Sequence, residues 1–124
     1  MSAKLIFTIH GIIYATFAVV LFFIPDVLWP LYGVSVNDQY AKFLSQHNSI
    51  FLGGVAIIAF LFSRAENNSE STKRLVVGLL WTNVLGVAVT LYASLVGIFV
   101  GFGWSDPIFF AFMSGLCVWW LAKN

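Results

Sequence analysis

Four long apolar runs, separated by three connections, make up most of the chain. The runs cover about residues 4–24, 43–63, 75–100 and 106–122. About 20 apolar residues in a helix cross the ~30 Å hydrocarbon core of a bilayer. Apolar residues occur all round each run instead of on one face, which is typical of helices in lipid. The sequence therefore predicts an all-α polytopic membrane protein, with residues 1–124 forming one antiparallel bundle of four transmembrane helices.

Local signals mark where these helices begin and end. Pro25 stops the first run, and Pro107 suits the first turn of the last one, where Ser105 or Asp106 can cap the helix. Ser35, followed three residues later by Asp38, resembles a capping box. We therefore expect the second helix to begin in water and to enter the membrane near residue 43.

The connections differ in polarity. The segment 25–42 is long but rich in apolar residues, so we expect it to lie in the headgroup layer or to fold over the outer mouth of the bundle. The segment 63–74 is a polar hairpin of mixed charge. Trp104 at one end of the last run, and Trp119 and Trp120 at the other, are predicted to anchor it at the two membrane interfaces.

Basic residues predict the orientation. The two chain ends and the 63–74 hairpin carry five of the six basic residues, and the opposite side carries Lys42 alone; the five are Lys4, Arg64, Lys73, Arg74 and Lys123. Cytoplasmic segments carry the excess of Lys and Arg. Both termini are therefore predicted to be cytoplasmic.

The composition agrees with a membrane protein and argues against nucleic-acid binding. Of the 124 residues, 60% are hydrophobic, 18% aromatic and 9% charged, with a formal net charge of +1 and a mean hydropathy of +0.94. Soluble domains carry about 25% charged residues. The chain has no basic surface for nucleic acid. We expect it to contact membrane lipids and either another membrane protein or further copies of itself.

Helices in lipid associate through small residues that let their backbones approach closely. Small and polar residues recur along each run at spacings of three or four, which places them on one face. The residues that we predict to pack helix against helix are Gly11, Ala15, Gly53, Ala56, Gly86 and Gly97.

The acidic residues exclude one class of transporter. All five lie in predicted loops or at helix ends. A proton-coupled small multidrug transporter would carry a carboxylate inside the membrane, which costs about 2.5–3.5 kcal/mol and is kept only for function. No catalytic or metal-binding residues are predicted, and the single cysteine, Cys117, is expected to be a small buried hydrophobic residue.

His10 is the deepest ionisable side chain. Tyr14 follows four residues later on the same face, and Asn83 lies in the same half of the membrane, with Thr90 two turns further along that helix. These four residues are the predicted ligand-binding group, for a quinone-like lipophile or a haem. The alternative is that His10 only hydrogen-bonds a neighbouring helix or a carbonyl group. Gln46 and His47 are predicted to be interfacial polar residues on the outer face.

Three stretches carry a resemblance to known proteins. "HGIIYATF" at 10–17, "IPDVLWPLYGV" at 24–34 and "QHNSIFLGGVAI" at 46–57 resemble small bacterial four-helix inner-membrane proteins of unknown function, with the DoxX-like proteins a looser neighbour. The resemblance implies a four-helix bundle in a bacterial inner membrane and implies no activity.

Three functions remain open at this point. The first is a membrane accessory protein or subunit that acts by helix packing. The second is a bundle that binds a lipophilic ligand or cofactor near His10. The third is a small transporter that works as a dimer.

Overall fold

The computed structural model describes residues 1–66 and 69–124, and the regular secondary structure in this part of the chain is helical. It contains α1 (Ala3–Phe23), α2 (Pro25–Leu31), α3 (Gln39–Phe62), α4 (Glu70–Leu95), the short 3-10 helix η1 (Gly101–Trp104) and α5 (Ser105–Lys123). Four of these helices are long and apolar enough to cross a membrane. The predicted fold class is confirmed. Residues 67 and 68 of the predicted polar hairpin lie outside the described residues.

Side-chain caps fix where three of the long helices begin. Ser2 accepts a hydrogen bond from the backbone N–H of Leu5, and Asp38 accepts one from Ala41 at 2.8 Å. Ser69 caps α4 in the same way. Each cap satisfies a backbone donor that the first helical turn leaves without a partner.

Two cap predictions are wrong. The cap of α3 is Asp38 and not Ser35, so α3 begins at Gln39. Neither Ser105 nor Asp106 caps α5: its N-cap is Trp104, which makes no side-chain cap hydrogen bond. η1 leads directly into α5, and this continuity leaves the Asp106 side chain free to face elsewhere.

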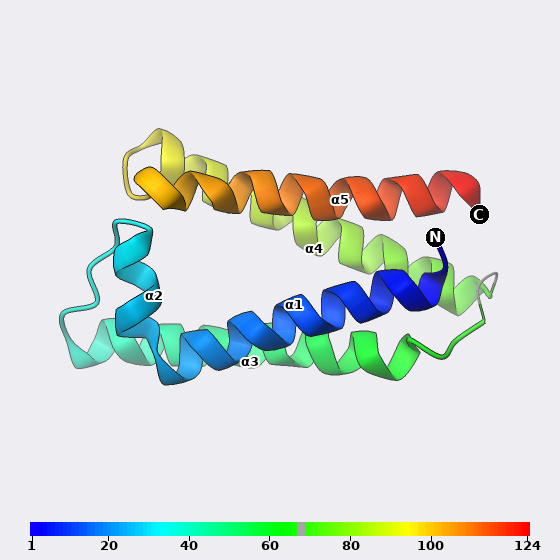
Figure 1. Cartoon of the computed structure of the whole chain (residues 1–124), viewed down its shortest axis with the longest axis horizontal. Helices are drawn as coiled ribbons and strands as arrows, with labels where there is room; N and C mark the ends of the chain where they lie inside the picture. The colour runs from blue at the N-terminus through cyan, green and yellow to red at the C-terminus, as the bar shows by residue number, and fades with distance from the viewer. Residues whose placement is uncertain (67–68) are drawn as a thin grey trace.

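The long helices form two antiparallel pairs. Figure 1 shows α1 beside α3 and α4 beside α5, with both chain termini at one end and α2 at the other. The pairs meet at the terminal end and diverge toward α2, which lies across the opening between them (Figure 1). The apolar segment 25–42 therefore contains a helix, where the sequence predicted only a loop.

The core occupies the end where the pairs meet. It is built from residues of all four long helices: Ala3, Ile6, Phe7, Ala59, Val76, Leu79, Cys117 and Trp120. The prediction that Trp120 is an interfacial anchor is wrong, because its side chain is 0% exposed. Its neighbour Trp119 is 45% exposed and stays on the outer surface. Successive residues of a helix point about 100° apart, so one of this adjacent pair faces the core and the other does not.

Most of the small residues predicted to pack lie where helices approach closely. A Cβ atom added to Gly11 would lie 2.7 Å from the Phe60 ring on α3, and one added to Gly86 would lie 2.5 Å from the Phe110 ring on α5. Gly53 faces Ala18 across the α1–α3 pair. Ala56 is buried on the same pair, and Ala15 is half-buried.

Gly97 does not pack helix against helix, contrary to the prediction. α4 ends at Leu95, and Gly97 follows with a φ of 83° and open space around its Cβ position. Its role is to let the chain leave the helix, as left-handed glycines commonly do at C-terminal ends. Gly33 has the same φ of 83° after α2, but a Cβ atom there would collide with the Val100 side chain.

Substituting these two glycines separates backbone strain from packing. Gly97→Ala is expected to cost about 1–2 kcal/mol, the strain of a left-handed alanine. Gly33→Ala adds the collision with Val100, so it is expected to cost about 1–2 kcal/mol more. Hydrogen exchange of the amides that flank each glycine measures the opening free energy. Equal losses of opening free energy in the two variants would contradict the packing contribution of Val100.

Candidate functional site

A chain of buried polar side chains crosses from one helix pair to the other. His10 and Tyr14 come from α1, and Asn83 comes from α4. The Tyr14 hydroxyl donates to Asn83 Oδ1, and Asn83 Nδ2 lies 3.0 Å from His10 Nε2. The Cys117 thiol on α5 lies 3.7 Å from the same nitrogen. Three of the four residues predicted as a ligand-binding group are therefore in contact.

The geometry sets the direction of each hydrogen bond. His10 Nδ1 lies 2.8 Å from the carbonyl oxygen of Ile6, which can only accept, so Nδ1 carries the proton. Nε2 is then the acceptor for the Asn83 amide. The amide oxygen accepts from Tyr14, so each of these three hydrogen bonds pairs one donor with one acceptor. Such matching is what a buried polar group needs in an apolar environment.

Both ring nitrogens of His10 are occupied, and its side chain is 0% exposed. His10 contacts both Asn83 and a carbonyl group, which is the arrangement that the structural alternative describes. Thr90 does not join it. Thr90 lies two helical turns beyond Asn83. Its hydroxyl donates to the carbonyl oxygen of Gly86 at 2.7 Å.

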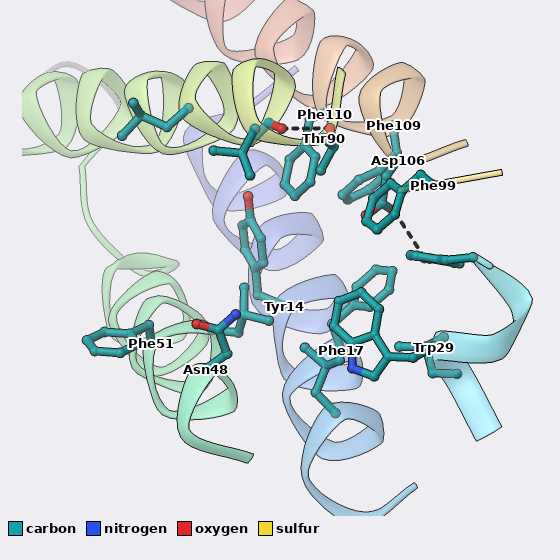
Figure 2. Close-up of a pocket in the computed structure, with 17 residues that line it drawn as sticks. Tyr14, Phe17, Trp29, Asn48, Phe51, Thr90, Phe99, Asp106, Phe109 and Phe110 are labelled. Carbon is teal, nitrogen blue, oxygen red and sulfur yellow. Dashed lines mark hydrogen bonds between the residues drawn. The ribbon is translucent and has the colours of Figure 1, made fainter. Parts of the chain in front are cut away.

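A cavity of about 380 Å³ lies next to these hydrogen-bonded side chains, where the two helix pairs diverge. Figure 2 shows side chains from all four long helices and α2 around it, with Tyr14 and Thr90 among them. Most of the lining is apolar, and ligand cavities of this size and character are common in proteins. The principal polar groups in it belong to Tyr14, Tyr32, Asn48, Thr90 and Asp106.

Aromatic residues form the α2 side of the cavity. Trp29 packs against Tyr32 and Phe99, with ring centroids 5.8 Å and 6.3 Å away. The Trp29 indole N–H donates to Ser45 Oγ at 2.9 Å, and Ser45 donates in turn to the carbonyl oxygen of Leu21 at 3.0 Å. These two bonds link α2 to α3 and α1, so the short helix is held in place.

Asp106 is the acidic residue of the cavity wall. The Tyr32 hydroxyl donates to Asp106 Oδ1 at 3.0 Å, which Figure 2 marks with a dashed line. Burial first, and then the nearby carboxylate, raise the pKa of Tyr32 above its ordinary value, so the hydroxyl stays protonated and keeps donating. This bond joins α2 to the start of α5 across the mouth of the cavity.

Gln46 and His47, which were predicted to be polar residues of the outer face, lie on α3. His47 is exposed, and its ring packs between Phe43 and Phe51 at centroid distances of 5.9 Å and 5.7 Å. Gln46 is half-buried, and its amide nitrogen donates to the carbonyl oxygen of Phe22 at 3.2 Å. Asn48 reaches the cavity instead (Figure 2).

The sequence did not single out the residues of the cavity mouth. Trp29 and Tyr32 were placed in a loop, and Asp106 was interpreted as a helix cap. One signal was available: five of the twelve residues at 99–110 are aromatic, and this segment meets Trp29 and Tyr32 of the segment 25–34 at the cavity.

No protein-family model, curated sequence or solved structure matches the chain.

Proposed function

We propose that this protein binds a lipophilic small molecule in the cavity between its two helix pairs. The observation that carries the proposal is the cavity itself, which is large enough for a ligand and lined by aromatic and aliphatic side chains. Interhelical cavities with few polar groups suit ligands that are mostly apolar. The protein is a polytopic membrane protein, so such ligands can reach the cavity from the bilayer.

The ligand site lies away from His10. Because His10 is sealed behind Asn83 and Tyr14, a ligand in the cavity meets the Tyr14 side chain as its floor and Thr90 as part of its wall. A lipophile with a hydroxyl group can donate a hydrogen bond to the Tyr14 or Thr90 oxygen, because both of these hydroxyl groups already donate their hydrogens within the protein. An axial haem ligand has no support from His10, since both of its ring nitrogens are already bonded.

The topology that we propose places both termini in the cytoplasm, with the cavity mouth and α2 on the outer side. The positive-inside rule supports it: five of the six basic residues belong to the end of the bundle that holds the termini. The resemblance to small bacterial four-helix proteins supports a bacterial inner membrane as the location.

Filling the cavity is expected to abolish ligand binding. The probe is a photoreactive aliphatic alcohol added to protein in maltoside micelles, and mass spectrometry maps the labelled residues. Labelling of Phe17 and Phe109, which line the cavity, is expected in the parent protein. The Thr90→Phe variant is expected to reduce this labelling about tenfold or more, which corresponds to about 1.4 kcal/mol of binding.

Thr82→Phe is the matched control. Thr82 is also on α4 and also donates to the carbonyl oxygen four residues earlier, at 2.8 Å, but it lies outside the cavity. Thr82→Phe is expected to label like the parent protein. Labelling spread over the lipid-facing residues, unchanged by Thr90→Phe, would refute the proposed function.

A second candidate function is a membrane accessory protein or subunit. Gly54, Gly78 and Gly115 have nothing within 4 Å of their Cβ positions, so their helix faces are open to close approach by another helix. Native mass spectrometry from the source membrane tests this candidate. A stable complex with a second membrane protein supports this candidate. Detection of the protein without any partner opposes it.

A further inference from the structure

We propose that the ligand of the cavity is an organic cation: a molecule with one ammonium head, held at Asp106, and an apolar chain that extends toward Tyr14. The inference rests on the proposed function, and it names the chemical class of the ligand.

The charge of Asp106 supports a cationic ligand. Asp106 is half-buried in a wall that is otherwise mostly aromatic and aliphatic. Within the described residues its hydrogen-bond partner is the Tyr32 hydroxyl alone, and the only ion pair is the one between Arg74 and Glu70. A carboxylate in an apolar wall is stabilised by a counter-charge. A cationic ligand supplies it.

The aromatic side chains around this carboxylate also support a cationic ligand. Trp29, Tyr32, Phe99 and Phe109 line the same cavity as Asp106. Trp29, Tyr32 and Phe99 form one cluster, with Tyr32 and Phe99 ring centroids 5.3 Å apart at an interplanar angle of 72°. Aromatic rings attract cations, and groups of them recognise quaternary and alkylated ammonium ions. An anionic head would be repelled by Asp106, and a neutral head would leave it without a counter-charge.

The shape of the rest of the cavity suits an apolar chain on the ligand. The α1 part of the lining extends from Tyr14 to Leu21, seven residues and so about 10 Å along the helix. Phe17, Leu52 and Leu85 contribute further apolar wall. An alkyl chain of about eight carbons matches this length, and its far end would reach the Tyr14 side chain.

The test measures head-group preference at constant chain length. Octyltrimethylammonium and octanol compete with the photoreactive alcohol in maltoside micelles, which carry no charge. In the parent protein the cation is expected to displace the label at about tenfold lower concentration than octanol does.

Asp106→Asn is expected to abolish this preference while octanol still competes. The asparagine can accept the same hydrogen bond from Tyr32, so the variant changes the charge and keeps the contact. Asp26→Asn is the matched control, because Asp26 is in the first turn of α2 and outside this cavity. It is expected to keep the preference of the parent protein.

Each outcome has one meaning. Equal competition by the cation and octanol overturns the cationic ligand, and a preference that survives Asp106→Asn overturns the placement of its head at Asp106; both results leave the lipophile site intact. No competition by either probe overturns both the inference and the proposed function. Competition by added phosphatidylethanolamine, but not by phosphatidylglycerol, in an Asp106-dependent way shows that the ammonium belongs to a lipid. If neither lipid competes and octyltrimethylammonium does, the ligand is a free amphiphile.

Discussion

Trp120→Ala is expected to lower the free energy of unfolding by about 3–5 kcal/mol, the range found when a buried tryptophan or phenylalanine is truncated. Trp120 is 0% exposed and belongs to the core where both helix pairs meet. The same core contains Ile6 and Phe7 of α1 and Val76 of α4, so truncating the indole removes packing from both helix pairs. Thermal or denaturant unfolding in micelles, followed by circular dichroism, measures the loss.

The neighbouring residue provides the control. Trp119→Ala removes the same side chain from the outer surface, where the indole is 45% exposed, so its expected cost is below about 1 kcal/mol. Similar losses for the two variants would mean that Trp120 does not hold the helix pairs together.

Asn83→Leu is expected to cost about 2–4 kcal/mol, because it leaves two buried groups without partners. The Tyr14 hydroxyl loses its acceptor and His10 Nε2 loses its amide donor. Each unsatisfied buried group costs about 1–3 kcal/mol, although hydrogen bonds between membrane helices tend toward the lower part of that range. The same unfolding measurement applies.

The triple variant His10→Leu, Tyr14→Phe, Asn83→Leu tests the reason for this loss. It removes the His10, Tyr14 and Asn83 polar groups together and leaves only the weakly polar Cys117 thiol. Apolar replacement of a whole network can be nearly neutral. We therefore expect it to be more stable than the Asn83→Leu single variant. A triple variant that is less stable than the single one would show that the polar chain contributes through its shape and not through its hydrogen bonds.

Much of the fold could be predicted from the sequence, because lipid leaves few choices for an apolar run of about 20 residues. The helix boundaries were less predictable. Gly97 could be placed either inside α4 or just beyond it, and only its φ of 83° decides. Trp119 and Trp120 could not be told apart either, since the rotation of α5 about its axis depends on packing and not on hydropathy.

The candidate site was predicted in part. His10, Tyr14 and Asn83 were grouped because intramembrane polar groups seek one another, and the structure places them in contact. Their separation from Thr90 and the cavity could not be foreseen. It depends on the angle between the two helix pairs, which follows from contacts between residues far apart in the chain. The same angle brings Asp106 near Tyr32, 74 positions earlier in the sequence.

The polar chain also has a consequence for assembly. The α1–α3 and α4–α5 pairs can each form as a hairpin in the bilayer before they dock. Apolar surfaces alone would let one hairpin slide along the other by a turn, about 5.4 Å. Such a slip would pull Asn83 away from both His10 and Tyr14, which belong to the opposite hairpin. The hydrogen bonds among these three side chains therefore favour a single docking register of the two hairpins.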